Sequence, residues 1–310
     1  MQPAATPSRG QPAALPAGGG GCYPAGGFPH GSLMTQSSPL PGPVAFIGGG
    51  NMARSLIGGL VARGVPAAQI RVAEPVAALR EALQRDFGVQ VHENAAAAAD
   101  GAAVWLLAVK PQVMREVCTG LAGLAGAQAP LAVSIAAGIT AGQLDRWLGG
   151  GAAVVRAMPN TPALLGAGIT GLYANAAAVA RLDQAADLLA AVGPTVRIAD
   201  EAQMDAVTAV SGSGPAYVFL LAEAMQQAGQ AQGLSAEAAR ALVGQTLLGA
   251  ATMLTRSEEP AEVLRARVTS PGGTTQAAIE TFEAGGFRTL VDRAIAAATE
   301  RGRQLSAANE

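Results

Sequence analysis

The stretch VAFIGGGNMA at residues 44–53 decides the fold. Four β-prone apolar residues, Val44 to Ile47, run directly into three glycines, and helix-forming residues follow. Glycine weakens regular structure, so three together indicate a turn in which the backbone approaches another group closely. The order of strand, glycine turn and helix is typical of the opening of a βαβ unit, and units that bind a dinucleotide begin in this way.

The glycine pattern Gly48-x-Gly50-x-x-Ala53 matches the dinucleotide fingerprint. There the first glycine permits a tight turn, the second admits the pyrophosphate, and the small third residue lets the helix pack closely. The free N–H groups that open the helix then favour a phosphate. A glycine turn in any α/β protein would look similar, but this one lies at the first strand–helix junction. We therefore expect Gly48, Gly50, Asn51 and Met52 to bind a dinucleotide.

Residues 44–198 alternate between strand-like and helix-like segments. The strand-like segments are short, and the first several are apolar throughout, as strands buried on both faces are. They lie at 44–48, 70–74, 89–92, 102–109, 131–137, 152–158, 168–174 and 196–198. The alternation predicts right-handed βαβ crossovers and an α/β, doubly wound, Rossmann-like sheet domain over 43–199.

The strand pattern stops after Ala199, and residues 200–310 predict an all-α second domain. Two breaks interrupt its helices, SGSGPAY at 211–217 and TSPGG at 269–273. Several helices are apolar on more than one face, so we expect a second copy of the chain to cover part of them. The expected helices lie at 201–210, 215–232, 235–255, 259–266, 274–283 and 286–305.

Residues 1–42 are rich in Pro, Gly, Ala and Ser and carry a single charge, Arg9. Such a segment buries too little apolar surface to offset its ordering entropy, so we expect it to be disordered. It has neither a secretory apolar core nor the amphipathic pattern of a transit peptide. Met34 is a candidate for the true start, which a native N-terminal peptide beginning at Met1 would contradict.

Composition excludes several classes of function. A net charge of −2 with 14% charged residues leaves no basic surface for nucleic acid. Cys22 and Cys118 fit neither a disulfide framework nor a metal spacing, so we expect a cytoplasmic protein without a bound metal. The most membrane-like stretch is the uncharged run 119–144, but it contains Pro130, two glutamines and five glycines and is too polar and broken to span a membrane.

Glu74 follows the second strand, where an acidic residue bonds the adenosine ribose hydroxyls and disfavours a 2′-phosphate. By that rule the cofactor is NADH. Glu74 suits the cap of the next helix equally well, and Arg71 or Arg80 could still meet a phosphate. The residues alone leave NADPH and NADH open.

Five motifs together resemble those of the pyrroline-5-carboxylate reductases, in that family's order and spacing over residues 44–305. They are FIGGGNMA at 46–53, LAVKPQ at 107–112, RAMPNTPALLGAG at 156–168, DAVTAVSGSGPAY at 205–217 and VTSPGGTTQAAIE at 268–280. The resemblance implies reduction of (S)-1-pyrroline-5-carboxylate to L-proline by hydride from NADPH or NADH. The residues agree, because a basic imine nitrogen needs no histidine acid and His30 and His92 are the only histidines.

The TSPGGTT loop is the expected substrate site. It opens a helix near Thr274, so free N–H groups of Gly273, Thr274 and Thr275 would hold the substrate carboxylate. The resemblance adds Ser270 and Gly272 to this site and implies that the Thr275 hydroxyl reaches the ring nitrogen, orienting it and donating a proton. A capped helix with nothing bound would show the same residues.

Lys110, the only lysine, ends a central strand, where α/β sheets bind ligands. The resemblance implies that Ala108, Val109 and Lys110 line the nicotinamide side of the cleft, with Lys110 assigned to catalysis. A lysine that merely extends its amine into solvent at a strand end is the alternative.

Two asparagines complete the expected site. The resemblance places Asn160 beside the nicotinamide and substrate, and Asn94 beside the adenosine end of the cofactor. Asn160 could equally stabilise a turn between two prolines, and Asn94 could cap a short helix.

Three alternative functions stay open at this point. A β-hydroxyacid dehydrogenase would need a lysine in the helical domain, and the sequence has none there. A reductase of a different cyclic imine would not need the carboxylate-binding PGGTT loop, and a dinucleotide sensor without catalysis would not retain it. The resemblance also implies a homodimer, or a larger ring, built through the C-terminal helices.

Overall fold

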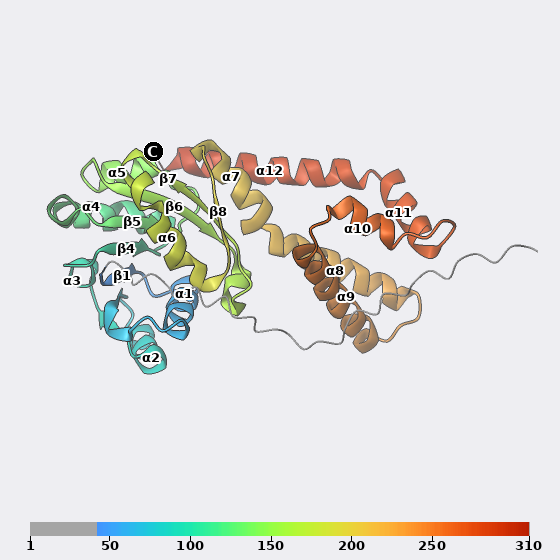
Figure 1. The fold of residues 1–310 in the computed structure, drawn as a ribbon, viewed down its shortest axis with the longest axis horizontal. Coiled ribbons are helices and arrows are strands. Elements are labelled where there is room, and N and C mark those ends of the chain that lie inside the picture. The colour runs from blue at the N-terminus through green and yellow to red at the C-terminus, as the bar shows by residue number, and fades with distance from the viewer. Residues whose placement is uncertain (1–41, 310) are drawn as a thin grey trace, which may run out of the picture. The chain divides into compact units, whose positions relative to one another are not determined.

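The structure is a computed structural model that describes residues 42–309 (Figure 1). The tail predicted to be disordered, with Cys22, His30 and Met34, lies outside the described residues. Within 42–309 no helix is long and apolar enough to cross a membrane.

The N-terminal part of the described chain contains one sheet of eight strands in the order β3-β2-β1-β4-β5-β6-β7-β8. Each strand overlaps one of the eight segments predicted from the sequence. The strands are β1 Val44–Ile47, β2 Ile70–Ala73, β3 Gln90–His92, β4 Val104–Leu107, β5 Leu131–Ser134, β6 Ala153–Pro159, β7 Thr170–Ala174 and β8 Thr195–Arg197.

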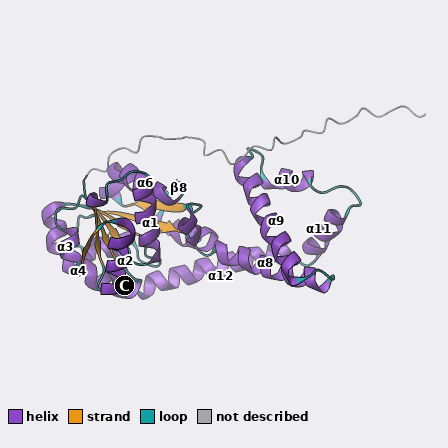
Figure 2. Cartoon of the chain, turned by 90° about the horizontal axis from the view of Figure 1, so that it is seen from below, coloured by secondary structure: helices purple, strands orange, loops and turns teal. Residues whose placement is uncertain are grey.

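Helices cover both faces of the sheet: in Figure 2 the purple helices lie around the orange strands. Side chains alternate along β1, so Val44 and Phe46 belong to one buried core while Ala45 and Ile47 belong to the other. The first core includes side chains of α1 (Asn51–Ala62), α2 (Ala77–Phe87) and α6 (Leu182–Leu189). The second includes side chains of α3 (Ala95–Ala99), α4 (Pro111–Gln128) and α5 (Ala141–Trp147). The doubly wound architecture is therefore confirmed.

One connection departs from the predicted alternation. All neighbouring strands are parallel except β6 and β7, which are antiparallel. Between Pro159 and Thr170 the chain forms only a short 3-10 helix, Thr161–Leu165. A parallel crossover needs about a dozen residues or more, so this segment can only reverse the chain. The prediction of βαβ units throughout was wrong here.

The described residues after β8 are helical, and the six predicted helices are present. They are α7 (Met204–Val207), α8 (Gly214–Ala231), α9 (Ala236–Arg256), α10 (Ala261–Arg267), α11 (Thr274–Ala284) and α12 (Phe287–Ala308). The first was expected as one α-helix over 201–210, but it is composite. A 3-10 turn at Glu201–Gln203 leads into α7, which continues as a π-helical turn at Thr208–Gly212.

The segment around the π-helical turn packs closely against the sheet. A side chain at Gly212 would come within 2.5 Å of the Met158 methyl carbon, and one at Gly171 within 2.6 Å of Val207. Strands β6 and β7 therefore approach this segment closely: a larger residue at Gly171 would meet the branched Val207 side chain, and one at Gly212 would require the flexible Met158 side chain to move. A π-turn in such a place commonly accompanies a functional site.

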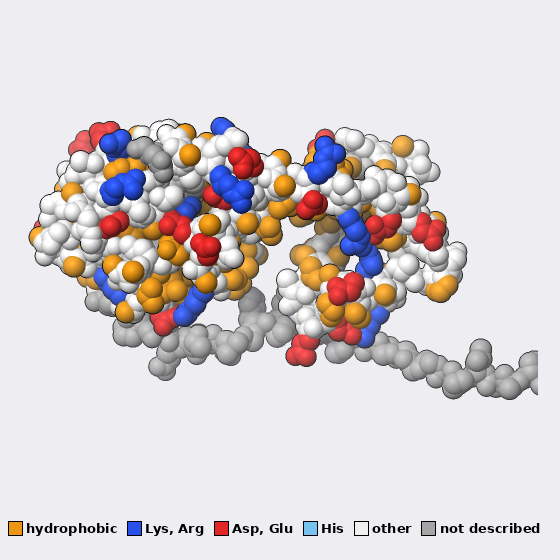
Figure 3. Space-filling view, turned by 90° about the horizontal axis from the view of Figure 1, so that it is seen from above, with side chains coloured by type: hydrophobic (Ala, Val, Ile, Leu, Met, Phe, Trp, Pro, Cys, Tyr) orange, Lys and Arg blue, Asp and Glu red, His pale blue; other side chains and the backbone are white. Residues whose placement is uncertain are grey.

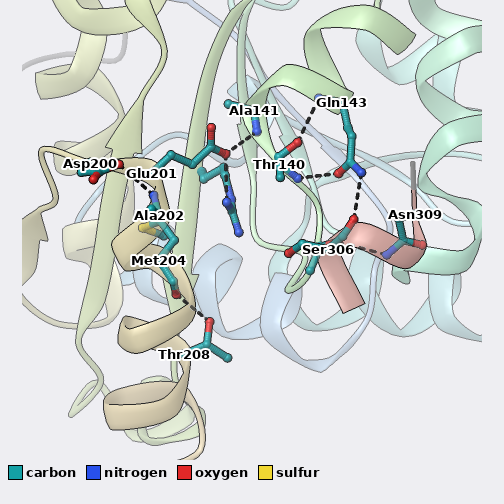
Figure 4. A network of polar contacts seen from close by, with 12 residues as sticks. Thr140, Ala141, Gln143, Asp200, Glu201, Ala202, Met204, Thr208, Ser306 and Asn309 are labelled. Atoms are coloured by element: carbon teal, nitrogen blue, oxygen red, sulfur yellow. Dashed lines mark hydrogen bonds and ion pairs between the residues drawn. The ribbon is translucent and has the colours of Figure 1, made fainter. Parts of the chain in front are cut away.

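The last turn of α12 returns to the sheet domain (Figure 4). Gln143 Nε2 donates to the Ser306 carbonyl at 3.0 Å, and Asn309 Nδ2 donates to the Gly138 carbonyl at 3.0 Å. Gln143 also completes a capping box with Thr140 at the start of α5. The C-terminal residues are thus bonded to the loop that follows β5.

An ion pair lies beside this contact. Arg156 Nη1 on β6 donates to Glu201 Oε1 at 2.8 Å, and the same oxygen accepts the Ala141 N–H at 2.6 Å (Figure 4). The Arg156 side chain is only 7% exposed. Glu201 therefore joins β6, the first turn of α5 and the segment that leads into the helical region.

Candidate active site

The glycine loop between β1 and α1 has the geometry that the fingerprint requires. Gly48 has φ +106°, and a Cβ there would lie 2.7 Å from the Ala108 carbonyl oxygen, so no other residue fits. Around Gly50 a Cβ would meet nothing within 4 Å. The backbone at Gly50 is therefore open to a ligand.

Helix α1 begins directly behind this opening. Its first backbone bond runs from the Arg54 N–H to the Gly50 carbonyl at 2.9 Å. The N–H groups of Gly50, Asn51 and Met52 have no hydrogen-bond acceptor among residues 42–309. Unpaired N–H groups at a helix start, beside an open glycine, fit the pyrophosphate of a dinucleotide.

Glu74, which follows β2, supports the glycine loop. Its side chain is buried, with 8% of the residue exposed. Oε2 accepts the Gly49 N–H at 3.0 Å, and Oε1 accepts the Val76 N–H at 3.0 Å. Sequence reasoning missed the bond to Gly49, because nothing local signals a contact across 25 positions. The expected ribose contact of Glu74 stays a prediction.

The end of β4 lies beside the glycine loop, because β1 and β4 are neighbours. The Ala108 N–H donates to the Ile47 carbonyl at 2.8 Å. Lys110 follows as the exposed N-terminal cap of α4, and it forms no ion pair with any residue of 42–309. The structure thus brings Gly48, Ala108, Val109 and Lys110 to one edge of the sheet.

Both predicted asparagines have structural partners. Asn160 Oδ1 accepts the Ile169 N–H at 3.0 Å, and its Nδ2 donates to the Ser211 carbonyl at 3.2 Å. Asn160 thereby joins the loop after β6 to the π-helical turn. Asn94 Oδ1 accepts the Ala97 N–H at 2.9 Å and caps α3. Their roles toward cofactor and substrate stay predictions.

The TSPGGTT loop corrects one expectation. The Gly273 N–H was expected to be free, but it donates to the Ser270 carbonyl at 3.0 Å, because the loop closes as a tight turn before α11. The Gly272 N–H donates to Gln276 Oε1 at 2.7 Å. The N–H groups of Thr274 and Thr275 have no acceptor among the described residues. Two amides, not three, are left for a carboxylate.

Apart from the bonds within α11, the hydrogen bonds of the TSPGGTT loop are local, to residues between 265 and 277. Within the described part of one chain, no hydrogen bond or ion pair joins the loop to the glycine loop or to the end of β4. The two halves of the expected site are thus not bonded to each other within one copy.

Cys118 takes no part in this site. Its side chain is buried on α4, and burial raises the pKa of its thiol to about 12. Cys118 therefore acts as a small apolar residue of the core.

Two family models match the chain. Residues 43–138 match the family described as NADP oxidoreductase, coenzyme F420-dependent. Residues 201–305 match the family described as pyrroline-5-carboxylate reductase dimerisation. The first contains the glycine loop and Lys110, and the second contains the TSPGGTT loop.

Characterised relatives agree with these matches along most of the chain. A pyrroline-5-carboxylate reductase of Pseudomonas aeruginosa is 56% identical, over 85% of this chain and 96% of the relative. The structure of a pyrroline-5-carboxylate reductase from Coxiella burnetii superposes with a TM-score of 0.83 at 40% identity, covering 86% of this chain and 98% of the other. The Plasmodium falciparum pyrroline carboxylate reductase, crystallised with NADP bound, gives a TM-score of 0.75 at 28% identity and covers 87% of this chain and 100% of the other. The glycine loop, the TSPGGTT loop and this similarity along nearly the whole described chain agree: the chain belongs to the pyrroline-5-carboxylate reductase family.

Proposed function

We propose that the chain reduces (S)-1-pyrroline-5-carboxylate to L-proline with hydride from NADPH or NADH. The observation that carries the proposal is a pair of helix starts with unpaired N–H groups, at Gly50–Met52 and at Thr274–Thr275. The reaction needs one site for a pyrophosphate and one for a carboxylate, and helix starts of this kind suit both anions.

The cofactor supplies a hydride when bound, and the chain positions the reactants. The amides at Gly50–Met52 hold the pyrophosphate, while Ala108 and Val109 line the nicotinamide end and Lys110 contributes positive charge at the same sheet edge. The amides of Thr274 and Thr275 hold the substrate carboxylate. The imine carbon gains the hydride, and the ring nitrogen ends with the proton that the Thr275 hydroxyl helps to deliver.

We further propose that the active site forms between two copies of the chain. Its helical region matches the family's dimerisation model, and the TSPGGTT loop makes only local bonds. Large apolar side chains are exposed on α8, α9 and α12, among them Phe219 at 68%, Leu242 at 56% and Leu290 at 64%. Hydrophobic side chains also reach the surface in Figure 3. A homodimer that buries these helices would bring one copy's TSPGGTT loop to the other copy's glycine loop.

NADPH is the proposed hydride donor, with NADH as the alternative. The Plasmodium relative binds NADP, and the family model for residues 43–138 names NADP. The predicted cytoplasmic location stays a prediction.

A direct assay tests the activity. Purified protein, pyrroline-5-carboxylate and NADPH are expected to give proline with loss of the NADPH absorbance, and the same assay with NADH compares the donors. Absence of proline with both donors would contradict the proposed function.

Thr275→Val tests the role of the hydroxyl. Loss of a positioned proton donor is expected to lower kcat about 100-fold while the Kd for NADPH stays nearly constant. Thr119→Val is the matched control, because Thr119 is an exposed helical threonine on the sheet domain. An unchanged kcat in Thr275→Val would remove Thr275 from the mechanism.

A further inference from the structure

The turn between β2 and α2 is the place where this fold distinguishes NADPH from NADH. The adenosine ribose lies against this turn in dinucleotide-binding folds, and the 2′-phosphate is the only difference between the two cofactors. Residues 74–76 form the turn, and α2 begins at Ala77. A role for this turn in choosing the cofactor rests on the proposed function.

We propose that Arg80 binds the 2′-phosphate of NADPH, and that Glu74 supports the glycine loop instead of selecting against that phosphate. This reverses the reading of Glu74 that its position alone favours. Three observations carry the proposal: the bonds of Glu74, the bonds of Arg80, and the partners of the other arginines nearby.

Glu74 is committed to the backbone. Each carboxylate oxygen accepts one N–H, from Gly49 and from Val76, both at 3.0 Å. Only 8% of the residue is exposed to solvent. Turning the side chain toward a ribose would leave two N–H groups without acceptors, including the Gly49 amide inside the glycine loop. A buried donor without an acceptor is strongly unfavourable, so the carboxylate stays on the loop.

Arg80 lies in the first turn of α2 and reaches back over the β2–α2 turn. Its Nη1 donates to the carbonyls of Glu74 at 2.7 Å and Pro75 at 2.8 Å. These two bonds fix the guanidinium beside the turn. Its Nε and Nη2 have no acceptor among residues 42–309, and Arg80 forms no ion pair there. A fixed guanidinium with free N–H groups is well suited to a phosphate.

The other nearby arginines are already occupied. Arg54 and Arg85 both pair with Asp86, at 2.6 and 3.0 Å. Arg71 donates to the carbonyl of Asp100, which precedes β4 and therefore lies at the opposite edge of the sheet from the glycine loop. Of these four arginines, only Arg80 combines the correct edge of the sheet with an unpaired charge.

Ligand binding tests the proposal without catalysis. Adenosine 2′,5′-bisphosphate carries the 2′-phosphate and AMP lacks it, so calorimetric titration with both probes isolates that group. Wild-type protein is expected to bind the bisphosphate more tightly. Arg80→Gln is expected to weaken bisphosphate binding about 10- to 100-fold, as loss of charge-assisted hydrogen bonds does, with AMP binding unchanged within about twofold.

Two further variants sharpen the test. Arg85→Gln, the matched control on the same helix, is expected to leave both probes unchanged. Glu74→Gln keeps the shape of the side chain but loses one acceptor for the N–H groups that it binds, so it is expected to lower the affinity for both probes by the same factor. Preferential improvement of bisphosphate binding in Glu74→Gln would restore Glu74 as the selector and overturn the proposal.

The remaining outcomes also decide. The proposal is overturned if Arg80→Gln, with an unchanged melting temperature, lowers the affinity for both probes equally or for neither. It is also overturned if the wild-type protein binds both probes with equal affinity. Wild-type protein that binds the bisphosphate tightly yet forms no proline would refute the proposed function and leave the Arg80 assignment standing. If Arg80→Gln forms proline and its activity with NADPH relative to NADH equals that of wild type, the Arg80 assignment alone is refuted.

Discussion

Replacing Glu201 with alanine gives a stability prediction whose size follows from the structure. The variant removes one oxygen that accepts two hydrogen bonds, from Arg156 Nη1 and from the Ala141 N–H. Arg156 is then left as a buried guanidinium without an ion-pair partner among residues 42–309, with Asp205 as the remaining carboxylate that acts on it. Breaking a buried ion pair in this way costs about 3–5 kcal/mol. The Glu201 side chain is 26% exposed, and solvent screening lowers the expected loss to about 2–3 kcal/mol.

Urea unfolding followed by far-ultraviolet circular dichroism measures this loss. All variants are compared at one protein concentration, because the stability of an oligomer depends on it. Glu300→Ala is the matched control: Glu300 pairs with Arg303 at 3.6 Å on the surface and is 56% exposed. Removing such an exposed pair is expected to cost less than about 0.5 kcal/mol.

The reasoning is refuted if Glu201→Ala loses no more stability than Glu300→Ala. A second variant tests the cause. Arg156→Met combined with Glu201→Ala is expected to be more stable than Glu201→Ala alone, because the unpaired buried charge is gone. If the double variant loses as much unfolding free energy as Glu201→Ala and Arg156→Met lose together when measured singly, and both losses are large, then packing and not the buried charge determines the loss.

Three other outcomes are expected. Gly193→Ala is expected to lose more than about 3 kcal/mol in thermal unfolding, because φ is +145° and a Cβ would overlap the Gly168 carbonyl oxygen; a wild-type melting temperature would contradict this. In a Cys22→Ser background, Cys118 is expected to react with a thiol reagent only after denaturation, since burial raises its thiol pKa to about 12; rapid modification of the native protein would be the opposite result. Burial raises the pKa of Asp205, so ionisation disfavours the folded state: Asp205→Asn is expected to be more stable than wild type at pH 7, with the difference vanishing as pH falls below about 4, and urea midpoints across this range check the sign.

The elements of this fold were predictable because each carries a local signal. Strands buried on both faces are uniformly apolar, as β1 and β4 are, and the glycine loop marks where the first strand becomes a helix. The helices after β8 were predictable from the breaks at 211–217 and 269–273. Strand β7 was predicted but its antiparallel direction was missed, because its residues resemble those of a parallel strand and only the short connection from Pro159 to Thr170 distinguishes the two directions.

The contacts that assemble the candidate site were less predictable, because they join distant positions. Glu74 was recognised from its place after β2, yet its bond to Gly49 depends on how the turn folds. The motif containing Arg156 was noted, but its partner Glu201 lies 45 positions away. The Gly273 N–H was expected to be free because a helix start has free amides in general, and the tight turn at Ser270 uses this one.

The return of α12 limits how the helical region can move. This region leaves the sheet domain through the π-helical turn at 208–212 and comes back to it at Ser306 and Asn309. Between these two points α12 also packs along α7 and the π-helical turn, so the region is held against the sheet domain where it leaves and where it returns. Truncating the chain before Leu305 would remove the bonds of Ser306 and Asn309 to the sheet domain and would leave the end of the chain held there only by the packing of α12 against α7 and the π-helical turn.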